Sequence, residues 1–388
     1  MKIAINTLSE NPLNPSGSLD FFKELATFLP KIDPINDYFF FVSNANKHLF
    51  ERDYKNYNLI IAGQSNERRL LRLISEQTSL PYRIYKSKAD VFFSSSSGGG
   101  APLIIPKNTK LIVGVYGTHH LCSIDIGTMR KFYRYLIMKY SLNRANVIVV
   151  NSESCKSDLL NYNSSVKSKI RVVNHGISKK LFHDGRITDV EKQILQESKV
   201  KIPYILFVSV IWYYKNIHTL AEAFGKFIQK TKSHHSLVLI GQFDKTSGIS
   251  DDYKERLISI AKNYGVADRI NFLGYIPKIK LRPFYRAADV YVQPSLHETF
   301  GKTLIEAMAC GCPVIAANNS SMPELLGNAG LLFETENSDN LSLKLEKMLT
   351  DSELRLEFIR RGKARAKKFT IEKEISQLVD VFHLAARS

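Results

Sequence analysis

The sequence predicts an α/β protein built from two doubly wound domains with parallel sheets. The chain has 388 residues, more than the roughly 100–200 residues of an ordinary domain. Short apolar runs alternate with longer helical patterns throughout, as expected for parallel strands buried on both faces. A polar, charged segment at residues 179–201 interrupts this alternation, and we expect the domain boundary there.

The expected strands follow one another in order along the chain. Those of the first domain are predicted at residues 3–5, 38–42, 91–93, 111–113 and 147–150. Those of the second are predicted at residues 204–208, 237–240, 289–292 and 313–316. The intervening segments are long enough to hold crossover helices, which parallel strands require.

The composition of the chain is typical of a globular protein. Hydrophobic residues make up 44% and charged residues 23%, which are values of a globular chain rather than a disordered one. No apolar run reaches the roughly 20 residues of a membrane-spanning helix, and Met1 leads directly into a strand pattern without a signal peptide. We therefore expect a cytoplasmic protein. The four cysteines are too few and too scattered for a disulfide framework or a zinc site.

The net charge of +17 bears on the partners of the protein. Residues 130–144 form a basic, aromatic-rich stretch with helical character. This stretch is either an ordinary helix with a solvated basic face or a surface that rests on anionic lipid, and the second reading places the protein on the inner face of the membrane. Nucleic-acid contact is a third reading, and nucleic acid is not expected as a partner.

The segment from Asp289 to Glu324 contains the candidate ligand-binding residues. A strand leads through a turn to Gly301 and then into a helix at residues 302–310. Gly301 lets backbone approach a ligand closely, and the free N–H groups of the first helical turn attract anions, so the segment suits a diphosphate. Glu306, about one turn into the helix, can accept hydrogen bonds from a ribose diol. Glu298, in the preceding loop, can accept from sugar hydroxyls or stabilise a developing positive charge.

The stretch PSLHETFGKTLIEAMACGCPV resembles glycosyltransferase family 4, whose members are retaining enzymes with the GT-B fold. The resemblance implies two facing Rossmann-like domains: an acceptor domain at residues 1–190, completed by a C-terminal helix at 370–388 that crosses back, and a nucleotide-sugar donor domain at 191–369. Leu206-Phe207-Val208 followed by Lys215 is similar to the donor-phosphate segment of the family. The donor-binding residues implied are Gly17, Lys215, Gln242, Ile276, Phe300, Gly301, Lys302, Thr303, Leu304 and Glu306.

The sequence departs from the family pattern in both domains. Ser16-Gly17-Ser18 resembles a Gly-Gly-Ser loop with one glycine missing. Tyr116 and Gly117 occupy the places of a His-Asp pair that many members carry. His119 and His120 follow, either as replacements for the missing histidine or as two ordinary loop histidines. In the second domain Ser209 stands where members have glycine, and Tyr214 where they often have arginine.

The resemblance implies a retaining transfer of a hexose from a nucleotide diphosphate sugar to a glycan or lipid-linked acceptor, in surface polysaccharide or lipopolysaccharide biosynthesis. It assigns catalysis to Glu298, Lys215 and one of His119 and His120. No Asp-x-Asp motif stands in a suitable loop, so no metal or other cofactor is expected. The alternative is a catalytically silent nucleotide-sugar-binding or scaffold protein of the same fold. A two-carboxylate glycosidase is disfavoured because both glutamates flank an anion-binding helix start. A dehydrogenase is disfavoured because no Gly-x-Gly-x-x-Gly follows the first strand.

Overall fold

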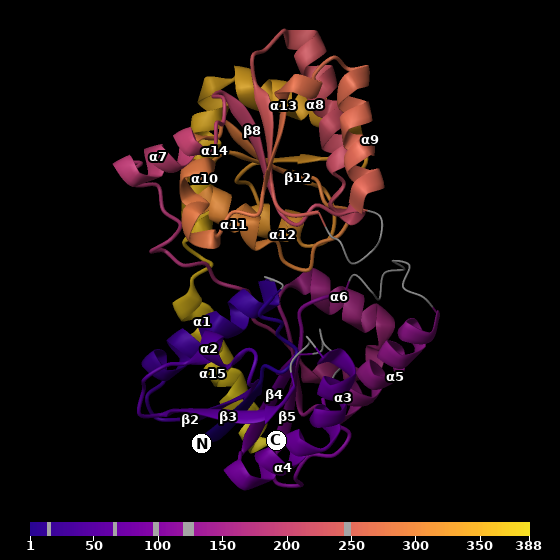
Figure 1. Ribbon diagram of the computed structural model, residues 1–388, viewed down its shortest axis with the longest axis vertical. Coiled ribbons are helices and arrows are strands. Elements are labelled where there is room, and N and C mark those ends of the chain that lie inside the picture. Colours follow the sequence, from indigo (N-terminus) through magenta and orange to yellow (C-terminus); the bar gives the residue numbers. More distant parts are fainter. Residues whose placement is uncertain (14–16, 65–67, 96–100, 119–127, 244–249) are drawn as a thin grey trace. The chain divides into compact units, whose positions relative to one another are not determined.

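The computed structural model describes residues 1–13, 17–64, 68–95, 101–118, 128–243 and 250–388 (Figure 1). The chain forms two compact units, Met1–Gly176 with Ile371–Ser388, and Ile177–Thr370. The units divide before the polar segment in which the sequence suggested a boundary at residues 190/191. That segment joins the second unit because the buried Arg282 guanidinium binds the Glu191 carboxylate at 2.5 Å and the His183 carbonyl at 3.0 Å.

The first unit contains a parallel sheet of seven strands in the order β3-β2-β1-β4-β5-β6-β7. The strands are β1 (Lys2–Asn6), β2 (Asp37–Ser43), β3 (Tyr57–Gly63), β4 (Val91–Ser95), β5 (Lys110–Val115), β6 (Val147–Val150) and β7 (Ile170–Val172). The helices are α1 (Gly17–Ile32), α2 (Lys47–Phe50), α3 (Arg69–Gln77), α4 (Ser79–Ser87), α5 (Thr128–Arg144), α6 (Glu153–Tyr162) and α15 (Ile371–Arg387), with a 3₁₀ turn at Ser164–Lys169.

The second unit contains a parallel sheet of six strands in the order β10-β9-β8-β11-β12-β13. The strands are β8 (Tyr204–Val208), β9 (Ser236–Ile240), β10 (Ile270–Gly274), β11 (Val290–Gln293), β12 (Val314–Ala317) and β13 (Leu331–Phe333). The helices are α7 (Asp189–Glu197), α8 (Ile217–Thr231), α9 (Ser250–Asn263), α10 (Arg282–Ala287), α11 (Lys302–Ala309), α12 (Met322–Leu326), α13 (Ser338–Thr350) and α14 (Ser352–Ala366), with 3₁₀ turns at Tyr213–Lys215, Ala267–Arg269 and Lys278–Lys280.

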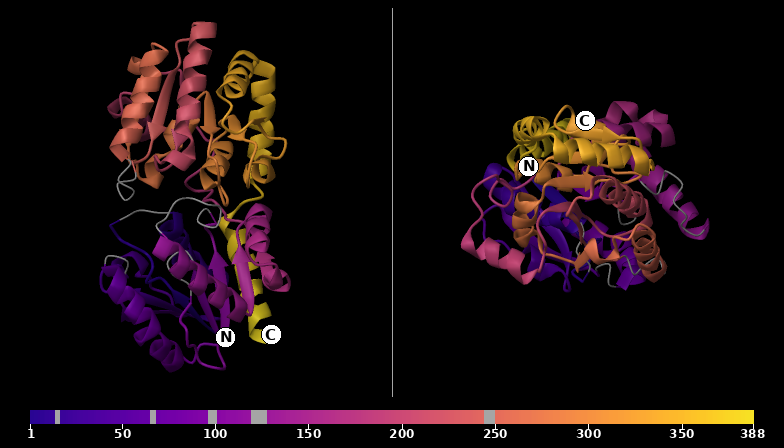
Figure 2. Two further views of the ribbon diagram at one scale, coloured as in Figure 1. Left: turned by 90° about the vertical axis from the view of Figure 1, so that its right-hand side faces the viewer. Right: turned by 90° about the horizontal axis from the view of Figure 1, so that it is seen from above.

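Each sheet is covered by helices on both faces, which explains why its strands are continuous apolar runs. In the first unit α1 and α15 pack on one face, and α4, α5 and α6 on the other. In the second unit α8, α9 and α13 cover one face, and α10, α11 and α12 the other (Figure 2). The packing of α15 on the first sheet confirms that the C-terminal helix crosses back to complete that unit.

The cysteines and the membrane-spanning character of the helices can also be compared with the sequence. Cys155, Cys310 and Cys312 are free and buried, and burial raises the pKa of the Cys310 thiol to about 12. Within the residues that the structure describes, no helix combines the length and the apolar character needed to span a membrane.

Candidate functional site

The central pair of strands in the second unit, β8 and β11, defines a topological switch point. The sheet grows from β8 toward β10 on one side and from β11 toward β13 on the other. The loops that leave the carboxyl ends of such a pair turn to opposite faces, and α/β proteins bind ligands between them. Lys215 follows β8 and Glu298 follows β11, so the sheet topology brings these two sequence-predicted residues together.

Backbone contacts fix the loop after β8 against the loop after β11. Asn216 adopts a left-handed conformation with φ of 55°, and its side-chain amide donates to the Pro294 carbonyl at 3.0 Å. The Leu296 N–H donates to the Tyr214 carbonyl at 2.8 Å. These contacts place Lys215, the residue between Tyr214 and Asn216, directly beside the β11 loop.

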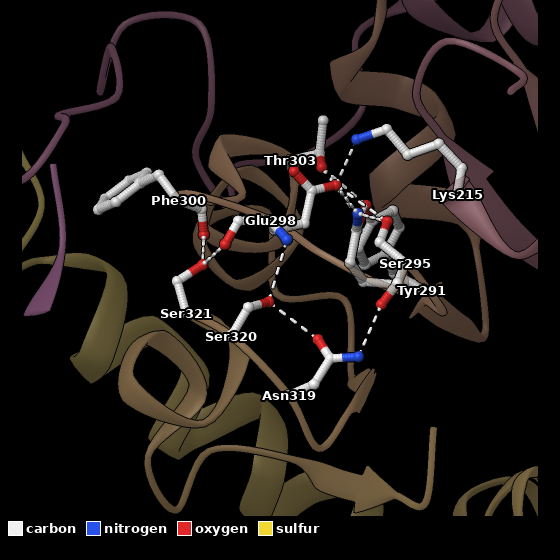
Figure 3. A network of polar contacts seen from close by, with 10 residues as sticks. Lys215, Tyr291, Ser295, Glu298, Phe300, Thr303, Asn319, Ser320 and Ser321 are labelled. Carbon is white, nitrogen blue, oxygen red and sulfur yellow. Dashed lines mark hydrogen bonds and ion pairs between the residues drawn. The ribbon is translucent and has the colours of Figure 1, made fainter. Parts of the chain in front are cut away.

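Lys215 and Glu298 form a nearly buried ion pair (Figure 3). Burial alone lowers the pKa of the Lys215 ammonium, but the Glu298 carboxylate outweighs that effect and raises the pKa above its ordinary value. The same carboxylate oxygen accepts from the Gln293 amide at 2.8 Å and from the Ser295 hydroxyl at 2.9 Å. Three donors therefore hold the Glu298 carboxylate in place.

Gln293 connects this carboxylate to the first turn of α11. Its side chain is fully buried, and its amide nitrogen donates to both Ser295 and Glu298. Its carbonyl oxygen accepts from the hydroxyls of Tyr291 and Thr303, whose oxygens lie 2.8 Å apart. Thr303 was predicted from the sequence, whereas Gln293 and Tyr291 were not, because both lie inside a strand whose apolar pattern indicated packing only.

The loop after β12 holds the backbone around Glu298. The Ser320 hydroxyl accepts the Glu298 N–H at 3.0 Å, and the Ser321 hydroxyl lies 2.9 Å from the Glu298 carbonyl and 2.7 Å from the Phe300 carbonyl (Figure 3). Phe300 itself is buried, with its ring edge-on to Phe369. The Phe300 carbonyl is thus engaged within the protein.

Gly301 precedes α11 in a conformation that favours glycine. Its φ is 98°, and a Cβ there would meet the Met322 methyl group at 2.7 Å. The Leu304 N–H already donates to the Gly301 carbonyl at 3.1 Å, and the Leu304 side chain lies in the core. Of the helix-start residues expected to contact an anion, Leu304 therefore has its N–H engaged within the protein.

Glu306 lies deeper than the sequence suggested. It is almost fully buried, its carboxylate accepts from the Tyr285 hydroxyl at 3.2 Å, and the Lys278 ammonium lies 3.7 Å away. Burial and the nearby Glu306 carboxylate raise the pKa of Tyr285 far above its ordinary value, so this hydroxyl remains a donor. Lys278 was not anticipated, because its position on a short 3₁₀ turn after β10 carries no motif.

Gln242 and Ile276 follow β9 and β10 at the same edge of the sheet. The Gln242 side chain is exposed and its carbonyl accepts from the Ile211 N–H at 2.8 Å, while Ile276 is half-buried against the core. Gly241 donates its N–H to the Gly274 carbonyl, and a Cβ at Gly241 would clash with the Ser209 carbonyl. The loops after β8, β9 and β10 are thus linked by backbone hydrogen bonds.

The candidate residues of the first unit lie in α1, directly after β5, and in the segment that follows. Gly17 is the first residue of α1, and a Cβ there would have open space around it. Tyr116, which follows β5, packs with tilted rings against Phe21 and His175, with ring centroids 4.8 and 5.1 Å away. His119 and His120 lie outside the described residues. Among the residues that are described, His, Cys, Asp and Glu side chains form no group of three or more that could hold a metal ion.

Comparison with solved structures identifies the architecture as GT-B. Sucrose-phosphate synthase from Thermosynechococcus elongatus has a TM-score of 0.77 at 20% identity over 98% of both chains. Anabaena HepE in complex with UDP and glucose has a TM-score of 0.74 at 18% identity over 99% of both chains. At these identities the likeness concerns the fold alone.

Two family models match successive parts of the chain. The model for Glycosyltransferase Family 4 matches residues 34–180, and the model for Glycosyl transferases group 1 matches residues 189–365. The chain therefore belongs to glycosyltransferase family 4. O-antigen chain mannosyltransferase B from Escherichia coli is 33% identical over 181 residues, which are 47% of this chain and 46% of that protein. The chain thus spans less than half the length of the first curated relatives that it matches.

Proposed function

We propose that the protein transfers a hexose from a nucleotide diphosphate sugar to a glycan or lipid-linked acceptor, with retention of the anomeric configuration. The observation that carries this proposal is the Lys215–Glu298 pair at the β8/β11 switch point, next to the start of α11. The relative named O-antigen chain mannosyltransferase B favours mannose as the first sugar to test and surface polysaccharide as the product class. The structure of HepE in complex with UDP-glucose supports a nucleotide-sugar donor.

The donor diphosphate replaces Glu298 as the partner of Lys215 in this proposal. Glu298 keeps two donors when the ammonium turns away, because Gln293 and Ser295 still hold its carboxylate. The N–H groups of Lys302 and Thr303 and the positive end of the α11 dipole add to the attraction for the diphosphate. Lys215 and the helix start together supply the positive charge that a leaving diphosphate needs.

The chemical step follows from these positions. The acceptor hydroxyl oxygen forms a bond to the anomeric carbon on the face from which the diphosphate leaves, and the bond from that carbon to the diphosphate oxygen breaks. A diphosphate oxygen takes the acceptor proton. Glu298 is fixed by three donors, one of them cationic, which suits an orienting group for sugar hydroxyls better than a nucleophile.

Because a buried cation and a helix terminus supply the positive charge, we propose that no metal ion takes part. We further propose that the protein works in the cytoplasm, on the inner face of the membrane, since its net charge of +17 favours an anionic surface where lipid-linked acceptors lie. Glu306 is assigned to the ribose of the donor, which requires that the nucleotide reach a carboxylate now bonded to Tyr285.

The test is a panel of UDP-, GDP- and ADP-sugars, GDP-mannose included, with EDTA present. Thermal unfolding is followed by the fluorescence of Trp212, the only tryptophan, which lies in the second unit. A nucleotide at 100 times its Kd should add about 2.7 kcal/mol of stability. Glu306→Gln should lower that gain, whereas Glu346→Gln, at a surface carboxylate bonded to Lys230, should not.

Transfer is then measured with the stabilising donor and radiolabelled sugar on membrane lipid extracts. Incorporation of label into lipid or glycan supports the proposal. Stabilisation by a nucleotide sugar without turnover would favour the silent binding protein, and stabilisation by none would contradict the donor site.

A further inference from the structure

Helix α3 buries charged side chains and exposes aliphatic ones, which is the reverse of an ordinary surface helix. Two of its three charged residues, Arg72 and Glu76, are 1% and 3% exposed. Its aliphatic residues Leu70 and Ile74 are 77% and 57% exposed. A helix at a water-exposed surface normally buries the apolar face and solvates the charges. The reverse arrangement indicates that the outer face of α3 meets something other than water.

The inward charges fix this orientation. Arg72 and Glu76 form a buried ion pair at 2.8 Å, and the Asn6 amide at the end of β1 lies 3.5 Å from the Glu76 carboxylate. Burial raises the pKa of Glu76, although the Arg72 guanidinium opposes that shift. Rotating α3 to bury its leucine and isoleucine would break this pair, so the aliphatic side chains remain outside.

The apolar surface continues from α3 to α5. The Gln77 side-chain carbonyl accepts the Leu103 N–H at 2.7 Å, and the Leu103 carbonyl accepts from Tyr140 at 3.3 Å and Arg144 at 2.6 Å. We define the α3–α5 face as the exposed side chains of Leu70, Ile74, Leu103, Ile104, Leu136 and Tyr140. Both helices lie on the same side of the first unit (Figure 1).

The basic residues of these helices favour an anionic partner for the α3–α5 face. The described side chains of α4 and α5 include the basic residues Arg83, Lys86, Lys139 and Arg144 and no acidic residue, and Glu76, the acidic residue of α3, is buried. A second copy of the chain on this face would bring like charges together. An acyl-chain layer under anionic headgroups satisfies both properties, because aliphatic side chains enter the layer while Lys139 and Arg144 stay at the headgroups.

We propose that the α3–α5 face docks on an anionic lipid surface. The inference deepens the proposed function, on which it rests, by naming the partner that brings the enzyme to a lipid-linked acceptor. It predicts two contributions to binding, one from apolar burial at α3 and the 103–104 loop and one from the basic residues. The first resists salt, and the second weakens as ionic strength rises.

The experiment is flotation of the full chain with vesicles of phosphatidylcholine, with and without phosphatidylglycerol. Wild type should bind the anionic vesicles at low salt. Leu70→Gln/Ile74→Gln should lower the partition coefficient about tenfold, since two exposed aliphatic side chains no longer enter the layer. Leu343→Gln/Leu356→Gln, at exposed leucines of α13 and α14, is the matched control and should bind like wild type.

Three results would overturn the docking surface. They are no flotation of wild type with anionic vesicles at low salt, equal flotation of the α3 variant, and a wild-type dimer that the α3 variant dissociates. None of these readouts involves a nucleotide. Failure of the donor site would therefore appear only in the nucleotide panel, and failure of the docking surface only in flotation.

Discussion

Removing the Lys215 ammonium tests whether the ion pair with Glu298 is a coupled unit. Lys215→Met keeps most of the side-chain volume but leaves the Glu298 carboxylate, with a side chain only 15% exposed, without its cation. Removing one partner of a buried pair costs about 3–5 kcal/mol. Gln293 and Ser295 still donate to the carboxylate, so we expect a smaller loss of about 2–4 kcal/mol.

Glu298→Gln leaves the buried ammonium unpaired, and we expect a loss of similar size. The double variant Lys215→Met/Glu298→Gln has no unpaired charge, and should lose at least about 2 kcal/mol less than the sum of the single variants. Urea unfolding followed by Trp212 fluorescence reports on the second unit and measures all three free energies. Single losses that add to within about 0.5 kcal/mol would refute the coupling.

Three further predictions concern the surroundings of the site. Gly301→Ala should destabilise the second unit by about 1–3 kcal/mol in urea unfolding, because alanine resists positive φ and its Cβ meets Met322; a wild-type midpoint would contradict this. Gln293→Leu should cost about 2–4 kcal/mol by the same assay and weaken donor binding, since Glu298 and Thr303 lose a buried partner; unchanged affinity would argue against its role. Burial and Arg256 lower the pKa of His218 to about 4, so its contribution to stability is complete above pH 6.5 and decreases as pH falls toward 4; His218→Phe should flatten this part of the profile of melting temperature against pH.

Buried strands were the easiest feature to predict from sequence. The nine runs named in advance all fall within or overlap strands of the two sheets, because parallel strands with helices on both faces must be apolar throughout. β3 was missed because it lies at the sheet edge and buries only Tyr57 and Ala62 of its seven residues. β7 and β13 have three residues each, which is too short to stand out.

The site was predictable only in part. The motif around Glu298 and the lysine after β8 placed both charges at one edge of the sheet, because sheet topology determines where parallel strands end. Their ion pair could not be foreseen, since 83 positions separate the two residues and no local pattern links them. The inverted burial of α3 was equally hidden, because periodicity shows that a helix has two faces but not which one is buried.

The most direct test of the account is equilibrium binding of the stabilising nucleoside diphosphate, measured by calorimetry. The double variant Lys215→Met/Glu298→Gln removes the phosphate cation without leaving a buried charge unpaired. Lys226→Met, at a partly exposed lysine bonded to Asp339 in the same unit, is the control. The account predicts about 10–100-fold weaker binding for the double variant and wild-type affinity for the control. Equal affinity in all three proteins would contradict the placement of the diphosphate at Lys215.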